Sequence, residues 1–280
     1  MSSVDIDYLK SWIGRERSST DLITPRLATS LYAVLDIDKL GENGAPAPAG
    51  IHWCIAPDIV PMSGIGPDGH PSRGGFLPPI PFPRRMWAGG SLTFFDRLRV
   101  GDEVTRSSTI KDVELKQGKS GALIFVTVQH DYATTRGLAL TERQDIVYRK
   151  LETTTSSRQS SAAPHDVIAD YSRPIDANPV LLFRYSAITF NGHRIHYDEP
   201  YVTTEEGYPG LIFHGPLQAT LLLGLAVELR NGELPDTFTF RSVRPLFSGG
   251  RVSINLRRGP RTTSLWVSDQ KGIVAMEASS

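Results

Sequence analysis

The sequence predicts an α+β protein built from two similar halves, each an antiparallel sheet wrapped around a helix. Three observations support this prediction: a faint repeat relates the halves, a small polar stretch separates them, and a very apolar helix is followed by four strand-like segments. With 280 residues, 40% of them hydrophobic and 21% charged, the chain has the composition of a globular protein with two ordinary domains or one large domain.

The repeat pairs residues 98–104 with residues 246–252, and alternating residues and a second strand follow each segment. The second strand is 123–128 in the first half and 264–267 in the second half. We interpret the repeat as two copies of one fold. The alternative is that it reflects only the pattern that β-hairpins have in common.

The small polar stretch, residues 153–164, consists mainly of threonine, serine and alanine and has no period, as is typical of a linker. It divides the chain into an N-terminal domain, 1–152, and a C-terminal domain, 165–280. Within the N-terminal domain, an insertion at 56–90 is so rich in proline and glycine that we expect no regular structure there.

Two short helices are expected to begin at Pro25 and Pro179. Thr24 and Asn178 place a capping side chain directly before each of these prolines, which suit the first helical position. The strongest predicted helix, 217–229, is apolar on nearly every face, so we expect sheet to surround it on several sides.

Asn231 and Gly232 are expected to end that helix, because these residue types adopt the left-handed conformation of a helix C-terminus. The segments after it alternate in the manner of strands and are separated by glycine-rich turns. We expect four strands: 237–243, 251–257, 263–267 and 273–278.

The charge pattern favours a small molecule as the partner. Thirty basic and thirty acidic side chains cancel, and no basic stripe with interleaved aromatics indicates binding to nucleic acid or to a membrane surface. Cys54 is the single cysteine, which excludes an internal disulfide and a cysteine zinc site and fits a reducing compartment. The N-terminal residues lack a signal-peptide core, and no apolar run reaches 18 residues, so we expect a cytoplasmic protein.

The residues best suited to catalysis lie in 183–198 and just beyond. Asn191, His193 and His196 share one polar stretch, and Gly215 follows before the apolar helix. A histidine has an unperturbed pKa of about 6.5 and can transfer protons near neutral pH. The backbone N–H of a glycine at a helix N-terminus can stabilise a developing oxyanion.

This stretch resembles the hydratase motif of the MaoC-like, (R)-specific enoyl-CoA hydratases. That motif is Asp-x-Asn-x-x-His, followed by a His-Gly that opens the central helix of a hot-dog domain. The resemblance implies a double hot-dog fold, proton transfer by His196 and oxyanion stabilisation by Gly215. It departs at Asn191, which stands where the family has its catalytic Asp, and at His193, which stands at the Asn.

An amide neither gains nor loses a proton near neutrality, so Asn191 can only orient water. His193 is the available substitute for the missing Asp, or it merely holds the turn. A neutral residue is useful if the substrate brings its own carboxylate to the reacting carbon, because two carboxylates would repel each other in a partly desolvated site.

If the substrate has a carboxylate, we expect arginine side chains nearby to bind it. Arg84, Arg85 and Trp87 lie in 83–90, which we expect to be a loop suited to a carboxylate or a CoA phosphate, and Arg194 lies inside the motif. The alternative is that these arginines are surface charges. We predict that all four residues bind substrate.

The wider resemblance covers nearly the whole chain. Residues 191–198, with 206–210 and 85–90, resemble the branch that includes mesaconyl-C4-CoA hydratases, bacterial itaconyl-CoA hydratases and mitochondrial hydroxyacyl-thioester dehydratases. It implies a non-catalytic first half, an acyl-CoA substrate and no separate cofactor, because CoA is part of the substrate. A homodimer is a further expectation for this class.

The function that we predict is hydration of itaconyl-CoA or mesaconyl-C4-CoA to citramalyl-CoA. A 3-hydroxyacyl-thioester dehydratase of fatty acid metabolism is the alternative among hydratases, and a hot-dog thioesterase or a non-catalytic acyl-CoA-binding module is the alternative of another class. No metal site is expected, because the two motif histidines lack a carboxylate at zinc-helix spacing. The remaining histidines are expected to be structural: His52, His70, His130, His165 and, as a residue that caps the helix or fixes the loop, His214.

Overall fold

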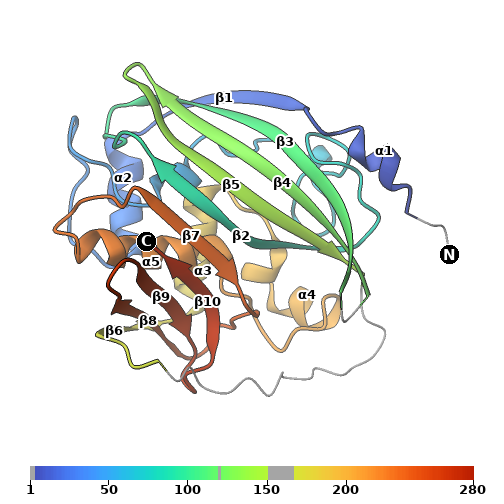
Figure 1. Ribbon diagram of the computed structural model, residues 1–280. Coiled ribbons are helices and arrows are strands. Elements are labelled where there is room, and N and C mark those ends of the chain that lie inside the picture. Colours follow the sequence, from blue (N-terminus) through green and yellow to red (C-terminus); the bar gives the residue numbers. More distant parts are fainter. Residues whose placement is uncertain (1–3, 119–120, 151–166) are drawn as a thin grey trace.

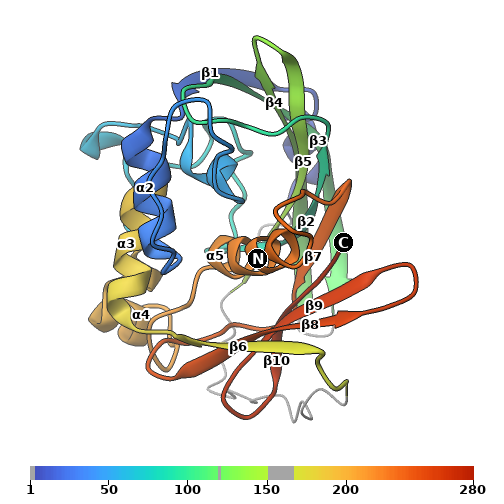
Figure 2. The same ribbon diagram turned by 90° about the vertical axis from the view of Figure 1, so that its left-hand side faces the viewer.

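The computed structural model describes residues 4–118, 121–150 and 167–280 (Figure 1). The predicted linker, 153–164, lies outside these residues. In the described part of the chain, all strands join one antiparallel sheet in the order β1-β3-β4-β5-β2-β7-β10-β9-β8-β6. The sheet is strongly curved, so that its two ends enclose the space in which the longest helix lies (Figure 2).

Strands from the first half of the chain occupy one side of this sheet, and strands from the second half occupy the other. The first set is β1 (Glu16–Leu22), β3 (Glu103–Gly118), β4 (Gly121–Thr134), β5 (Gly137–Arg149) and β2 (Arg84–Phe94). The second set is β7 (Thr237–Ser242), β10 (Val274–Ser279), β9 (Thr263–Ser268), β8 (Arg251–Arg258) and β6 (Tyr171–Asp176).

Counted outward from the central pair β2 and β7, both sets have the same order of strands along the chain. The repeated segments of the sequence lie at equivalent places in the two sets. Segments 98–104 and 246–252 lead into β3 and β8, while 123–128 and 264–267 belong to β4 and β9. The predicted α+β double hot-dog fold is therefore present, and the four strands predicted in the second half end within a residue or two of their observed bounds.

Helix α5 (Gly215–Glu228) contacts β8, β9 and β10 of the second half and also β2 and β7. It starts two residues before the predicted start, and ten of its residues are buried, as its apolar sequence predicts. Gly232, with a φ of 92°, donates its N–H to the Val227 carbonyl at 2.8 Å and closes the helix end as expected.

Helices α2 (Pro25–Val34) and α3 (Pro179–Thr189) begin at the predicted prolines. The side chains of Thr24 and Asn178 accept hydrogen bonds from backbone N–H groups in the first turns, at 3.1 and 2.9 Å. The two helices pack against each other on the side of α5 that faces away from the sheet (Figure 2). The remaining helical segments are short: α1 (Ile6–Lys10), η1 (Ile51–Cys54), η2 (Met62–Gly64), η3 (Arg194–His196) and α4 (Glu199–Thr204).

The halves differ in their central helix. Between α2 and β2, where a helix like α5 would be expected, the first half has only the 3₁₀ turns η1 and η2. This part of the chain is rich in proline and glycine, which interrupt helical hydrogen bonding. Cys54 ends η1 and is buried, and burial raises the pKa of its thiol to about 12, so the thiol has no signs of reactivity.

The prediction that 83–90 is a loop is wrong. Most of this segment belongs to β2, which lies in the middle of the sheet and pairs with β5 and β7. Gly89 and Gly90 are needed because neighbouring strands approach them closely: a Cβ on Gly90 would lie 2.9 Å from Cζ of Phe240 and collide with the Arg143 carbonyl. The β2–β5 register also shifts between Trp87 and Gly89, as at a bulge.

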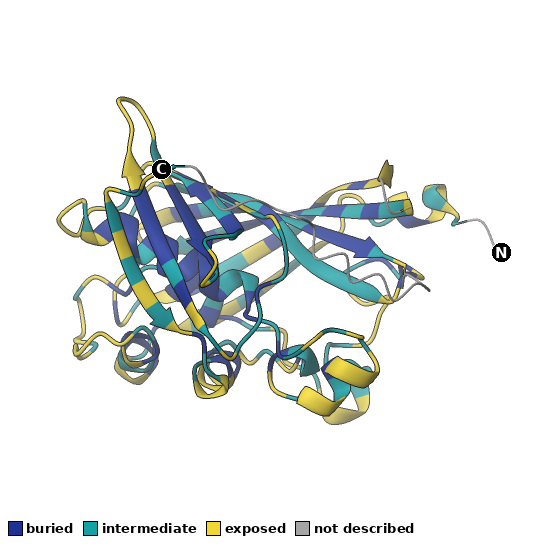
Figure 3. Cartoon of the chain, turned by 90° about the horizontal axis from the view of Figure 1, so that it is seen from below, coloured by how far each residue is buried: buried dark blue, intermediate teal, exposed yellow. Residues whose placement is uncertain are grey.

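Buried residues concentrate in the strands and in α5, and the outer faces of the other helices are exposed (Figure 3). The main core surrounds α5 and includes residues from both halves. A second core lies in the first half, between its strands and the segment before β2 that carries Ile80 and Phe82.

We predict that a fragment starting at residue 165 will not fold into an active protein. Without the first half, β7 loses its partner β2 and becomes an exposed edge, and α5 loses part of its apolar cover. Far-UV circular dichroism and size exclusion of the purified fragment would measure this. A monodisperse, active fragment would show that the halves are independent.

Candidate active site

The turn that follows α3 carries the residues of the predicted motif. Phe190 ends the helix in the left-handed conformation, with a φ of 52°, and turns the chain toward the interior. The side-chain oxygen of Asn191 accepts a hydrogen bond from the His193 N–H at 3.0 Å, and the Asn191 N–H donates to the Ser186 carbonyl at 2.9 Å. Asn191 therefore holds the turn in shape while it lines the cavity.

His196 is buried and has a defined tautomer. Its Nδ1 lies 2.8 Å from the carbonyl oxygen of Ile212, which can only accept, so Nδ1 carries the hydrogen and Nε2 has a free lone pair. Burial lowers the pKa of His196 to about 4, although the hydrogen bond to Ile212 opposes the shift. At neutral pH the residue is thus a neutral hydrogen-bond acceptor that faces the cavity.

The ring of His214 packs against the ring of His196. The two rings stack with centroids 3.6 Å apart, and His214 Nε2 lies 2.9 Å from the hydroxyl of Ser186. His214 is fully buried and does not line the cavity, which agrees with the expected role of fixing the loop.

Gly215 is the first residue of α5, and no hydrogen-bond acceptor for its N–H is found in the described part of the chain. Trp87 lies directly against it, since a Cβ on Gly215 would be 2.9 Å from Cε3 of the indole. The indole also stacks on Phe240, with centroids 4.4 Å apart, and its buried Nε1–H has no partner among the described residues. Both N–H groups are suited to an oxygen atom of a ligand.

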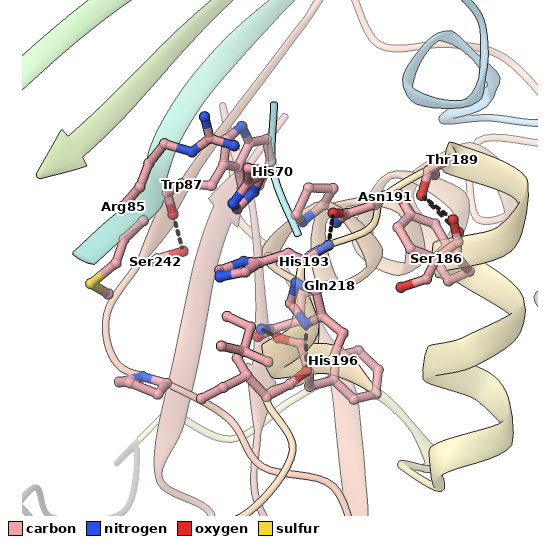
Figure 4. Close-up of a pocket in the computed structure, with 18 of the residues that line it drawn as sticks. His70, Arg85, Trp87, Ser186, Thr189, Asn191, His193, His196, Gln218 and Ser242 are labelled. Carbon is pink, nitrogen blue, oxygen red and sulfur yellow. Dashed lines mark hydrogen bonds between the residues drawn. The ribbon is translucent and has the colours of Figure 1, made fainter. Parts of the chain in front are cut away.

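His193 lies between His196 and a residue from the first half, His70. The ring centroids are 5.4 Å from His196 and 4.0 Å from His70 (Figure 4). Burial, with the neighbouring His70 as the next cause, lowers the pKa of His193 well below its ordinary value. The site is therefore a cluster of neutral histidines.

The insertion of the first half brings His70 to this cluster. Asp68 accepts hydrogen bonds from the His70 backbone N–H at 3.0 Å and from its Nδ1 at 3.1 Å. From the sequence, His70 was expected to be structural, because it has no partner pattern and an Asp-x-His in a glycine-rich segment carries no signal of what the segment packs against. The structure gives it a place in the site.

Two of the predicted arginines line the cavity and one does not. Arg84 pairs with Glu206, with Nε and Oε2 3.5 Å apart, and lies 4.8 Å from the Tyr208 ring centroid. Arg85 also lines the cavity and points toward His70 (Figure 4).

Arg194 instead binds Asp198 through two hydrogen bonds of 2.9 and 2.8 Å, and its Nη1 donates to the Pro67 carbonyl at 3.0 Å. It is not among the residues that line the cavity. The structure gives no support to its predicted contact with substrate, and Arg194 rather fastens the insertion to the motif.

The cavity has a volume of about 1930 Å³, larger than the ~300–1000 Å³ that is usual for small ligands. Besides the histidine cluster, its lining includes residues 242–252 and 269–271 of the second half and Arg17, Arg106 and His130 of the first half. A long ligand with its reacting group near the histidines fits this shape.

Asp68, His70 and His193 are the described residues whose potential metal-ligand atoms gather most closely, within 4.8 Å of one another. Asp68 and His70 Nδ1 satisfy each other, and the rings of His70 and His193 lie against each other. This arrangement suits proton transfer better than a convergent ligand set, and the absence of a metal remains a prediction.

Comparisons with known proteins show to which family the chain belongs. A family model for hydroxyacyl-thioester dehydratase type 2 matches residues 50–248. A mesaconyl-C(4)-CoA hydratase of Chloroflexus aurantiacus is 42% identical over 250 residues, which cover 88% of this chain and 87% of that protein. The chain belongs to the hydroxyacyl-thioester dehydratase type 2 family. The predicted enzyme class, a hydro-lyase of the hydratase type, is thereby confirmed.

A further relative agrees with the family, and two solved structures agree with the fold. A mitochondrial hydroxyacyl-thioester dehydratase type 2 of Schizosaccharomyces pombe is 28% identical over 78% of this chain and 79% of that protein. A MaoC-like dehydratase of Phytophthora capsici superposes with a TM-score of 0.71 at 15% identity, over 99% of this chain and 97% of that one. A double hot-dog protein of Mycobacterium tuberculosis gives 0.54 at 11% identity, over 95% and 94%. At such identities the structures show the fold alone. Within the described residues of this family member, no helix has the length and apolar character needed to cross a membrane.

The buried histidines predict a pH-dependent stability. Burial is the largest cause in lowering the pKa of His52, His70 and His196 to about 4, against about 6.5 in the unfolded chain. The unfolded state therefore binds more protons below pH 6.5. Stability is retained above this pH and is lost as the pH falls toward 4, by about 1.4 kcal/mol per pH unit for each such histidine.

Denaturant unfolding at pH values from 8 to 5 would measure this effect. We expect little change from pH 8 to 7 and a marked fall below 6.5. A free energy of unfolding that is constant from pH 7.5 to 5 would contradict the view that these histidines are held neutral.

Proposed function

We propose that this protein catalyses the hydration of a branched five-carbon dicarboxylyl-CoA, interconverting mesaconyl-C4-CoA and citramalyl-CoA, with itaconyl-CoA as a second candidate substrate for the same product. The observation that carries the proposal is the pairing of His196, a neutral acceptor of fixed tautomer, with the free N–H of Gly215 in a cavity that also holds Arg84 and Arg85. The 42% identity to a mesaconyl-C(4)-CoA hydratase supports the same substrate class.

In this reaction a water oxygen forms a bond to the β-carbon, and the electrons of the double bond move toward the thioester as an enolate. The N–H of Gly215 at the positive end of α5 stabilises the enolate oxygen. Nε2 of His196 accepts a hydrogen bond from the attacking water and so orients it. Asn191, neutral at all working pH values, adds no negative charge next to the carboxylate that mesaconyl-C4-CoA carries at its reacting carbon.

A panel of acyl-CoA thioesters tests this function. We expect the parent protein to remove the enoyl absorbance of mesaconyl-C4-CoA faster than that of crotonyl-CoA, and His196→Ala to lower the rate by about 10²–10⁴-fold with an unchanged circular dichroism spectrum. Release of free thiol would indicate a thioesterase, binding without turnover would indicate a binding module, and a preference for plain enoyl thioesters would favour the fatty acid dehydratase. A turnover rate of His196→Ala within a few-fold of the parent rate would contradict the catalytic role of His196.

The neutral residue at position 191 makes a separate prediction. Asn191→Asp should penalise mesaconyl-C4-CoA more than crotonyl-CoA, because carboxylates about 4 Å apart repel by about 4 kcal/mol at an effective dielectric constant of 20, an upper figure that nearby arginines reduce. The measurement is kcat/KM for both substrates, with Asn191→Gln as the neutral control. Equal losses for both substrates with Asn191→Asp would mean that the amide serves only the shape of the turn.

A further inference from the structure

The hydratase reaction proposed above needs a group that takes a proton from water, and in the family's motif an Asp stands at the position of Asn191. Position 191 cannot supply that group in this chain, because an amide has no suitable pKa. The described structure offers one carboxylate joined to a histidine at the site, the pair Asp68 and His70 of the insertion.

The insertion is docked on the motif through its backbone. The Arg194 N–H donates to the Asp68 carbonyl at 2.9 Å, and Gly69 and Gly192 meet with no room for side chains. A Cβ on Gly192 would lie 2.7 Å from the Gly69 oxygen, and one on Gly69 would collide with the Gly192 carbonyl. Gly69 also has a φ of 88°, which other residues adopt only with strain. This contact sets where His70 lies relative to the motif.

His70 has the geometry of a base supported by a carboxylate. Its Nδ1 is hydrogen-bonded to Oδ2 of Asp68 at 3.1 Å, so that Nδ1 donates and Nε2 keeps its lone pair. Its ring lies against that of His193 and lines the same cavity as His196, with 17% of the side chain exposed. Two neutral histidines, His70 from the first half and His196 from the second, therefore present lone pairs to one cavity.

We propose that His70, supported by Asp68, is a catalytic residue of the hydration and replaces the Asp that is missing at position 191. One water molecule donates hydrogen bonds to Nε2 of His196 and to Nε2 of His70, and only its proton toward His70 is transferred. As the water oxygen bonds to the β-carbon, its proton passes to Nε2 of His70 and the double-bond electrons form the enolate. The imidazolium then returns this proton to the α-carbon, so that one water molecule is added and both histidines end neutral. This inference rests on the proposed function.

The supporting charge decides which histidine takes the proton. A carboxylate stabilises the imidazolium of His70, whereas the Ile212 carbonyl behind His196 carries no net charge. Burial lowers the pKa of His70 to about 4; Arg85 and, more weakly, Arg73 act in the same direction, while Asp68 opposes them. His193 is the remaining titratable group against the ring, and it is itself neutral. A substrate carboxylate beside Arg85 would offset the positive charge and make His70 a better base.

The test uses the enoyl-CoA that the full-length parent hydrates best. We expect His70→Ala to lower kcat by about 10²–10⁴-fold with little change in KM, and added imidazole to restore part of the rate. Asp68→Asn should lower kcat about tenfold or more, and Asp68→Glu should recover much of the loss. The acid limb of the pH–rate profile should move to lower pH in Asp68→Asn, because the carboxylate raises the pKa of His70.

Arg73→Gln is the matched control. Arg73 holds the same insertion through hydrogen bonds of 2.8 Å to the carbonyls of Ile80, Phe82 and Pro83, and none of these bonds involves Asp68 or His70. We expect it to keep kcat within a few-fold of the parent. A loss equal to that of His70→Ala, without rescue by imidazole in either variant, would show that the insertion matters only for its shape and would overturn the proposal.

Three further outcomes would also overturn it. A parent that hydrates no enoyl-CoA removes the proposed function and the role of His70 with it. A parent that hydrates its substrate while His70→Ala keeps full kcat removes the role of His70 alone. Loss of parent activity on dialysis against EDTA, with recovery on added Zn²⁺, would show that Asp68, His70 and His193 hold a metal ion instead.

Discussion

The pairing of β2 with β7 is the constraint on which the site depends. It joins the two halves into one sheet, and it places the indole of Trp87 on Gly215 at the start of α5. The pairing is close because Gly89 and Gly90 have no side chains to hold the neighbouring strands apart. A larger residue at either position would separate the strands and move the arginines and the indole away from the helix N-terminus.

Glycine has a similar role where the insertion meets the motif. Between α2 and β2, a stretch that the structure describes throughout, the first half has no central helix like α5, and its chain instead runs through a long irregular segment that covers the site of the second half. Contact between Gly69 and Gly192 lets this segment approach the motif closely enough for histidines from both halves to touch. The half that lacks the hydratase motif thus supplies part of the cavity wall, through Arg84, Arg85 and His70.

Charge in the site follows from burial. The histidines are kept neutral because a charged imidazole would lose its hydration in the interior. In His196, the hydrogen bond from Nδ1 to the Ile212 carbonyl also sets the tautomer. Positive charge comes from arginines, one of them paired with Glu206. A neutral Asn191 fits these surroundings if the substrate brings the anionic groups. The carboxylate of Asp68 lies behind His70, so the imidazole ring separates its charge from the cavity.

Local signals in the sequence predicted several of the helices and strands. A capping side chain before proline predicted the starts of α2 and α3, the leucine-rich run predicted α5, and the motif pointed to His196 and Gly215. These features depend on neighbours within a few residues, so a single sequence contains them. Tertiary structure alone decided that Gly89 and Gly90 belong to a central strand, that Arg194 faces the insertion, and that Asp68 and His70 reach the motif more than 120 positions away. Those outcomes depend on contacts between distant segments, about which the local pattern of residues carries no information.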